Sequence, residues 1–345
     1  MRNGILDEIW DDERLAFLME HWFPDQIWTL RIGVGGMNNT TRFVEAGGIS
    51  YVLRIYETHR DFNKVNFEHT VLLALADQKL PYQLPQPMRL QTGGTVLTID
   101  ANEGKLAALF TFTEGSNPLW DNAQQLHRFG ETVGHLSKTL ASIQVELKPE
   151  YPPYYKIEHI HPRCTPEVIK QFCLHPPESF SKEITNLPYI WHRFEAFYEE
   201  IPKLMTLPHQ LVHGDINGSN MLIDEQGHVV AVLDFEFVTR DVRVMELAVC
   251  VSDLIDPTLS EQKLYEVCSV FYEGYCSYIN LKEEEIRLLP LLIELRRLDV
   301  FVHFLGRYLD GVDAHRVLID IIHNTVQKVK WLEAYGPKLV NIFKI

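Results

Sequence analysis

Hydrophobic and polar positions alternate in short runs over the first third of the chain, and glycine pairs separate several of these runs. Residues 50–56 alternate as a half-buried strand does, directly after the turn residues Gly47 and Gly48. Residues 62–78 instead carry apolar side chains at helical spacing. The pattern predicts a first helix over residues 6–22, a helix over 62–78 and strands over 28–34, 41–46, 50–56, 95–99 and 106–112.

Beyond residue 115 the pattern becomes mainly helical. It predicts helices over 122–143 and 191–204, two short strands over 221–224 and 229–233, and long helices from there to the C-terminus. Prolines concentrate between about 148 and 190, which we interpret as an irregular insertion within one domain. We therefore predict an α+β fold of two lobes: residues 1–113 with a five-stranded antiparallel sheet and a helix, and a larger, mainly helical lobe over 114–345.

Composition narrows the classes of function. The 345 residues carry a formal net charge of −15, which disfavours nucleic acids and anionic membranes as partners. The five cysteines form no C-x-x-C pair, which indicates reduced thiols, and the acidic start and short apolar runs indicate neither a signal peptide nor a transmembrane span. We expect a cytoplasmic protein.

One loop and the strand after it carry the candidate chemistry. His213, Asp215 and Asn220 lie between two strand-like runs, and Asp234 follows another hydrophobic strand. In phosphoryl transfer one carboxylate orients the attacking hydroxyl, while a second carboxylate and a carbonyl-type ligand hold Mg²⁺ on the nucleotide phosphates. Each piece alone is also ordinary turn chemistry. The combined spacing favours Asp215 as the catalytic base and Asn220 and Asp234 as metal ligands.

These residues resemble the H-G-D-x-x-x-x-N and D-F/W-E/D signatures of the aminoglycoside phosphotransferase and choline kinase superfamily. Residues 241–248 look most like members related to type II homoserine kinase. The resemblance implies a two-lobed protein-kinase-like fold and small-molecule kinase activity with ATP and Mg²⁺, with GTP left open. It also implies supporting roles for His213 and for Glu246, which stands where the family usually has Asp and which would brace the catalytic loop.

The resemblance also directs attention to the nucleotide. Arg54 stands on a strand where kinases usually have Lys, and Glu68 follows on the next helix at a spacing suited to an ion pair. The alternative is a structural salt bridge between strand and helix. The first hairpin would cover the phosphates with its backbone, and the segment near residue 112 would hydrogen-bond the adenine. The predicted nucleotide-binding residues are Gly35, Gly36, Asn38, Arg54, Glu68 and Phe112.

The predicted acceptor site lies on the last third of the chain. Arg296, Asp299, His303 and Arg307 recur at helical spacing and share one face, and we add Glu236 from the strand-borne motif. An arginine and Asp299 would bind the carboxylate and ammonium of an amino acid. A salt-bridged helix face is the alternative interpretation.

Several acceptors remain open at this point. Homoserine or a similar amino alcohol comes first, followed by an aminoglycoside, choline or ethanolamine, and a methylated thio-sugar. The alternative from another class is a non-catalytic binding or structural protein that keeps the kinase fold, as some spore-coat relatives do. Expected partners are a nucleotide and a small hydroxyl substrate, and a homodimer is left open. No Walker sequence, G-x-S-x-G elbow or zinc-ligand spacing is present.

Overall fold

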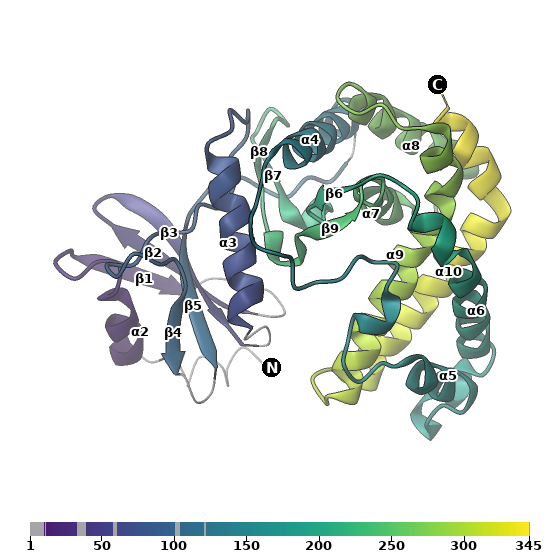
Figure 1. Ribbon diagram of the computed structural model, residues 1–345, viewed down its shortest axis with the longest axis horizontal. Coiled ribbons are helices and arrows are strands. Elements are labelled where there is room, and N and C mark those ends of the chain that lie inside the picture. Colours follow the sequence, from purple (N-terminus) through teal and green to yellow (C-terminus); the bar gives the residue numbers. More distant parts are fainter. Residues whose placement is uncertain are drawn as a thin grey trace. The chain divides into compact units, whose positions relative to one another are not determined.

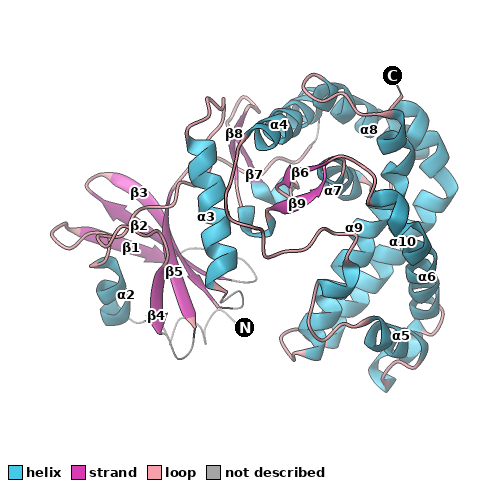
Figure 2. Cartoon of the chain, in the orientation of Figure 1, coloured by secondary structure: helices cyan, strands magenta, loops and turns pink. Residues whose placement is uncertain are grey.

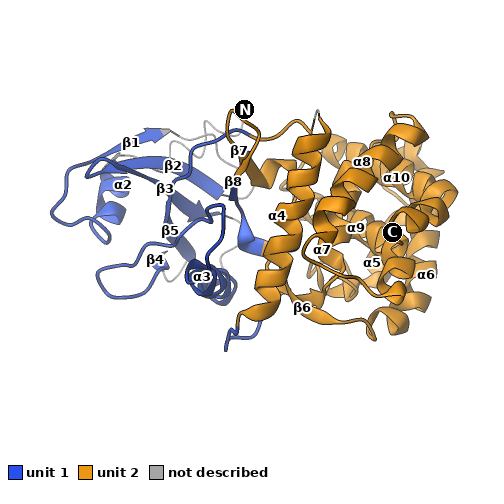
Figure 3. Cartoon of the chain, turned by 90° about the horizontal axis from the view of Figure 1, so that it is seen from above, with its two compact units in different colours: residues 1–116, 144–150, 230–236 blue, residues 117–143, 151–229, 237–345 orange. Residues whose placement is uncertain are grey.

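The computed structural model describes residue 10 and residues 12–32, 39–57, 61–100, 104–120 and 122–344. The chain divides into two compact units, shown in Figure 3. The first consists of residues 1–116, 144–150 and 230–236, and the second of residues 117–143, 151–229 and 237–345. Two later segments thus belong to the first unit, which hydrophobic patterning along the chain does not indicate. The roles assigned to the two parts stay predictions.

The first unit is built on a five-stranded antiparallel sheet with the strand order β1-β2-β3-β5-β4 (Figure 2). Gly47 and Gly48 both have positive φ, at 59° and 77°, which is the conformation that a two-residue hairpin turn between β2 and β3 requires. The strands are β1 (Trp28–Ile32), β2 (Asn39–Ala46), β3 (Ile49–Tyr56), β4 (Leu97–Asp100) and β5 (Lys105–Thr111).

The two faces of this sheet have different functions. Leu53 and Leu109 point into a hydrophobic core shared with α2 (Asp12–Met19). One residue further along β3, Arg54 lies on the opposite face, where its ion pair with Glu68 joins the sheet to α3 (Phe62–Ala76). Asp61 begins α3 because its carboxylate accepts hydrogen bonds from the backbone N–H groups of Asn63 and Lys64. Strand alternation therefore sets Arg54 apart from the core.

The first predicted helix is shorter than the sequence indicates, since α2 covers Asp12–Met19, and residues 6–9 lie outside the described part. The other predicted elements of this unit are present with small shifts of their ends.

The second unit is mainly helical (Figure 1). Its close α4–α8 pair depends on glycine, because a Cβ at Gly130 would lie 1.9 Å from the Phe271 carbonyl oxygen, and one at Gly274 2.1 Å from that of His127. The longest helices, α9 and α10, also pack on one another. The helices are α4 (Ala123–Ser142), α5 (Pro166–Leu174), α6 (Asn186–Leu204), α7 (Met245–Leu254), α8 (Glu261–Cys276), α9 (Glu283–Leu309) and α10 (His315–Ile342).

The proline-rich insertion is more regular than predicted. It contains α5, which begins at Pro166 after the N-cap Thr165, and α6 begins at Asn186 with Pro188 in its first turn. Proline is well tolerated in the first turn of a helix because the N–H that it lacks has no intrahelical partner there. The expectation of an irregular segment up to residue 190 was therefore wrong in these two places.

Short strands flank the candidate catalytic loop. β6 (His209–Val212) pairs antiparallel with β9 (Thr239–Val242), and β7 (Met221–Ile223) forms a hairpin with β8 (Val229–Val232). The sequence indicated β7 and β8 but not β9, whose four residues Thr-Arg-Asp-Val show only a short alternation.

Candidate active site

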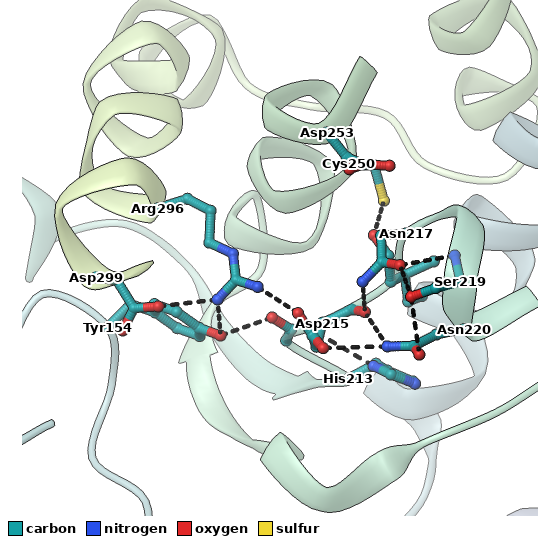
Figure 4. A network of polar contacts seen from close by, with 12 residues as sticks. Tyr154, His213, Asp215, Asn217, Ser219, Asn220, Cys250, Asp253, Arg296 and Asp299 are labelled. Carbon is teal, nitrogen blue, oxygen red and sulfur yellow. Dashed lines mark hydrogen bonds and ion pairs between the residues drawn. The ribbon is translucent and has the colours of Figure 1, made fainter. Parts of the chain in front are cut away.

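The loop between β6 and β7 holds Asp215 in place with hydrogen bonds from its own residues (Figure 4). The Asn220 side-chain amide donates to the backbone carbonyl of Asp215 at 2.9 Å and to its Oδ2 at 3.1 Å. The Asp215 backbone N–H donates to Nδ1 of the buried His213 at 3.2 Å. The motif spacing therefore has a direct geometric meaning: the residue five positions later orients the carboxylate.

The predicted acceptor helix α9 reaches this loop through one arginine. Arg296 forms an ion pair with Asp215, donates to Asp299 Oδ2 at 2.8 Å and donates to the Tyr154 hydroxyl at 3.2 Å (Figure 4). Burial opposes the charge of Arg296, but Tyr154, Asp215 and Asp299 together raise its pKa. Burial raises the pKa of Asp299 to about 6, against the opposing effect of Arg296. The structure thus brings together Asp215, Arg296 and Asp299.

Tyr154 is a further residue of this network and was not among the predicted site residues. Its hydroxyl donates to the Gly214 carbonyl at 2.6 Å, and its backbone N–H donates to the buried carboxylate of Asp241 at 2.5 Å. Burial raises the pKa of Asp241 to about 7, although the N–H groups of Tyr154 and Val242 favour its charged form. The insertion therefore supports both the catalytic loop and Arg296. No local pattern marks this tyrosine among its neighbours.

Glu246, at the start of α7, holds the catalytic loop through two backbone N–H groups. Its Oε2 accepts the backbone N–H of His213 at 2.6 Å and its Oε1 accepts that of Gly214 at 3.3 Å. Burial raises the pKa of Glu246 to about 7, while these two N–H groups act in the opposite direction. A carboxylate with two acceptor oxygens matches two adjacent N–H donors.

We expect Glu246→Gln to reduce kcat roughly tenfold and to lower stability by about 1–3 kcal/mol, because the amide presents one acceptor and one donor to two buried N–H groups. Steady-state kinetics and thermal unfolding measure both effects. Glu199→Gln, at an exposed position on α6, is the matched control and should change neither. Wild-type kcat in Glu246→Gln would show that the two hydrogen bonds do not shape the catalytic loop.

In the first unit, one arginine is surrounded by carboxylates. Arg54 Nη1 lies 3.5 Å from Glu68 Oε1 and 3.4 Å from Asp234 Oδ1, and its guanidinium lies 5.3 Å from the centre of the Phe110 ring. Burial raises the pKa of Glu68 to about 8, with Arg54 lowering it and Asp234 and Glu236 raising it further. One guanidinium thus lies close to two carboxylates and is also influenced by the charge of Glu236, and its role in nucleotide binding stays a prediction.

The residues predicted to hold a divalent cation have suitable oxygen atoms. Asp234 Oδ1 is buried and accepts no hydrogen bond. The Asn220 amide N–H groups donate to Asp215, and its Oδ1 accepts only a long hydrogen bond of 3.4 Å from the Ser219 hydroxyl among the contacts described. Among the described residues no group of three or more His, Cys, Asp or Glu side chains could enclose a metal alone. Mg²⁺ in kinases is held by one or two protein oxygens together with nucleotide phosphates, so each of these oxygen atoms is of the kind that such an ion binds.

Other predicted acceptor residues have partners of their own in the structure. Arg307, three turns after Arg296, is buried and pairs with Asp313 at 2.5 and 3.0 Å, so shared helical spacing does not make it part of one small-molecule site. His303 packs against the rings of Phe237 and Phe304. Glu236 belongs to the first unit, where its charge acts on Arg54 and Glu68.

The predicted nucleotide contacts of the first hairpin cannot be compared with the structure, because Gly35, Gly36 and Asn38 lie outside the described residues. Phe112 is partly exposed, and its ring lies against Phe43. Its backbone N–H donates to the Ser50 carbonyl at 3.2 Å, so that N–H is already used within the sheet. Only its backbone carbonyl fits the predicted role of hydrogen-bonding the adenine.

Comparison with known proteins identifies the family. The model of the phosphotransferase enzyme family matches residues 29–266, more than half of the chain. The chain belongs to this family. It is 25% identical to a homoserine kinase of Zymomonas mobilis, over 82% of both chains. Two solved structures share its fold: a microcompartment-associated aminopropanol kinase (TM-score 0.67, 18% identity, 96% of this chain and 99% of the other) and an amicoumacin kinase solved with AMP-PNP and Ca²⁺ (0.64, 17%, 94% and 96%).

Membership and the shared fold confirm the predicted two-lobed α+β kinase-like fold and make this chain a phosphotransferase. Its function also involves a small-molecule substrate, as in the related kinases. No described helix of the phosphotransferase is long and apolar enough to cross a membrane. The individual site residues stay predictions, argued below from their contacts.

Proposed function

We propose that this phosphotransferase transfers the γ-phosphoryl group of ATP, with Mg²⁺, to a hydroxyl group of a small amine-bearing metabolite. Homoserine or a similar amino alcohol is the first candidate, ahead of aminoglycosides, choline and ethanolamine. The observation that carries this proposal is the contact of Arg296 with both Asp215 and Asp299, since it puts charged side chains of α9 beside the proposed base. The resemblance to homoserine kinases supports the same order.

In this mechanism Asp215 orients the acceptor hydroxyl and accepts its proton. Its carboxylate is fixed on one side by the Asn220 amide and on the other by Arg296. Arg54, braced by Glu68, binds the nucleotide phosphates. Asn220 and Asp234 would hold Mg²⁺, which neutralises charge on the transferred phosphoryl group when bound. Positioning and charge neutralisation supply most of the catalysis, because the transition state is loose.

A coupled ADP-release assay with ATP or GTP and Mg²⁺ tests this function over homoserine, 3-amino-1-propanol, ethanolamine, choline and an aminoglycoside. We expect the highest kcat/KM for homoserine with ATP. Mg²⁺-dependent thermal stabilisation by ATP without turnover of any hydroxyl acceptor would instead support the non-catalytic alternative. Turnover confined to choline or an aminoglycoside would keep the phosphotransfer but reject the proposed acceptor.

A further inference from the structure

Arg297 follows Arg296 on α9 but is held very differently. Its Nη1 donates to the Asn324 side-chain oxygen at the long distance of 3.5 Å, and its buried Nε, like that of Arg296, has no hydrogen-bond partner. Within the described part of the chain it forms no salt bridge, whereas Arg296 contacts two carboxylates and a hydroxyl. Burial and then the like charge of Arg296 lower the pKa of Arg297 to about 10.

A second cation, Lys328 of α10, is buried and interacts electrostatically with Arg297. Lys328 of α10 donates to the backbone carbonyls of Ser252 at 2.7 Å and Asp253 at 3.4 Å, near the C-terminal end of α7. It too lacks a salt bridge in the described ranges, and burial followed by the charge of Arg297 lowers its pKa to about 8. Two cations whose charges act on one another thus have no carboxylate within salt-bridge distance among the described residues.

The carboxylates nearest to Arg297 do not form salt bridges with it. The charges of Asp253, Asp299 and Asp215 raise the pKa of Arg297, but none of these carboxylates lies within salt-bridge distance of it. A largely buried guanidinium with unmade hydrogen bonds is costly, and a carboxylate that accepts two parallel N–H bonds is the group that best satisfies it. Because the charge of Asp215 raises the pKa of Arg297, the two groups are close enough to interact electrostatically.

We propose that Arg297, together with the charge of Lys328, binds the carboxylate of the phosphate acceptor, and that the acceptor is therefore a hydroxy amino acid. This rests on the proposed function and narrows it, since simple amino alcohols, choline and aminoglycosides carry no carboxylate. Arg296 is already neutralised by Asp215 and Asp299, so Arg297 is the arginine whose charge and N–H donors are available for a bound anion. Arg297 is then a specificity-determining residue.

The test compares homoserine with 3-amino-1-propanol, which is the same molecule without the carboxylate. We expect the wild-type kcat/KM to favour homoserine by roughly 100-fold or more, because a buried cation is left unpaired by the smaller acceptor. Arg297→Gln should lower kcat/KM for homoserine about 100-fold, mainly through KM, and change that for 3-amino-1-propanol less than about threefold. Arg287→Gln, at an exposed position on the same helix, is the control and should change neither.

Two further measurements do not depend on turnover. L-2-aminobutyrate, which is homoserine without its hydroxyl, should stabilise the wild-type protein against thermal unfolding and should not stabilise Arg297→Gln. The unliganded Arg297→Gln protein should melt at or above the wild-type temperature, because the variant loses a buried, unpaired charge. A markedly lower melting temperature would indicate a structural role for Arg297 and overturn the proposal.

The two proposals fail in different ways. Equal wild-type kcat/KM for the two acceptors, or an equal loss for both in Arg297→Gln, overturns the carboxylate subsite and leaves the phosphotransfer intact. If no acceptor is phosphorylated, the proposed function fails and L-2-aminobutyrate decides about the subsite. Stabilisation that depends on Arg297 supports it, and lack of stabilisation of the wild-type protein rejects it.

Discussion

Asp215→Asn is expected to reduce kcat at least about a thousandfold while leaving nucleotide binding intact. The variant keeps the size of the side chain but removes the group that accepts the hydroxyl proton, and a positioned base contributes roughly 10²–10⁴ in rate. Its single amide oxygen can serve either Arg296 or Asn220, both of which contact the carboxylate now. Steady-state kinetics with saturating ATP and acceptor measure the loss.

The matched control for this variant is Asp320→Asn, which changes the net charge equally at an exposed position on α10 in the same unit. Thermal unfolding separates a chemical effect from misfolding: Asp215→Asn should retain the stabilisation that Mg²⁺ and ATP give to the wild-type protein. Loss of that stabilisation would place Asp215 in nucleotide binding. Undiminished phosphoryl transfer would remove it from the mechanism.

The catalytic loop illustrates what the sequence can specify. Asn220 reaches Asp215 because both residues belong to one short loop. The motif spacing alone therefore predicts the hydrogen bonds between them. Strand alternation likewise separates Arg54 from the core residue Leu53 beside it. In both cases the relevant neighbours are a few residues apart, or on adjacent strands whose pairing follows from the hairpin.

Contacts between distant segments were not predictable in the same way. Tyr154 reaches the catalytic loop only because the chain brings the insertion next to Asp241 of β9, 87 residues later. Helical spacing gave the shared face of Arg296 and Arg307 but not the fact that Asp313, just beyond the end of α9, neutralises Arg307. Periodicity defines a face, whereas the long-range partners of each turn decide which residues of that face remain available for a ligand.

The lack of a carboxylate partner for Arg297 could not be predicted from the sequence either. In the sequence it is the second of two adjacent arginines, and nothing distinguishes it from Arg296. Only the structure shows that Asp215 and Asp299 neutralise Arg296, whereas Arg297 donates to the uncharged side chain of Asn324 on α10. A specificity residue defined by missing partners can be recognised only once the partners of its neighbours are known.

Asp234→Asn is expected to reduce kcat at least about a thousandfold and to abolish the Mg²⁺-dependent part of ATP binding. Asp234 has a φ of 66°, a left-handed conformation that asparagine adopts readily and alanine does not. The asparagine variant therefore removes the carboxylate charge without adding backbone strain, whereas Asp234→Ala also strains the turn by about 1 kcal/mol. Kinetics at increasing Mg²⁺ and thermal unfolding with ATP, with and without Mg²⁺, measure the effect.

The contrast between the two carboxylates is the decisive part of this experiment. If Asp234 holds the cation and Asp215 acts on the acceptor, only Asp234→Asn should lose the stabilisation that Mg²⁺ adds to ATP, although both variants lose turnover. Asp77→Asn, an equal charge change at an exposed position of the same unit, should behave as wild type. Full Mg²⁺ dependence in Asp234→Asn would limit Asp234 to its ion pair with Arg54, 3.4 Å away, and would require another cation ligand.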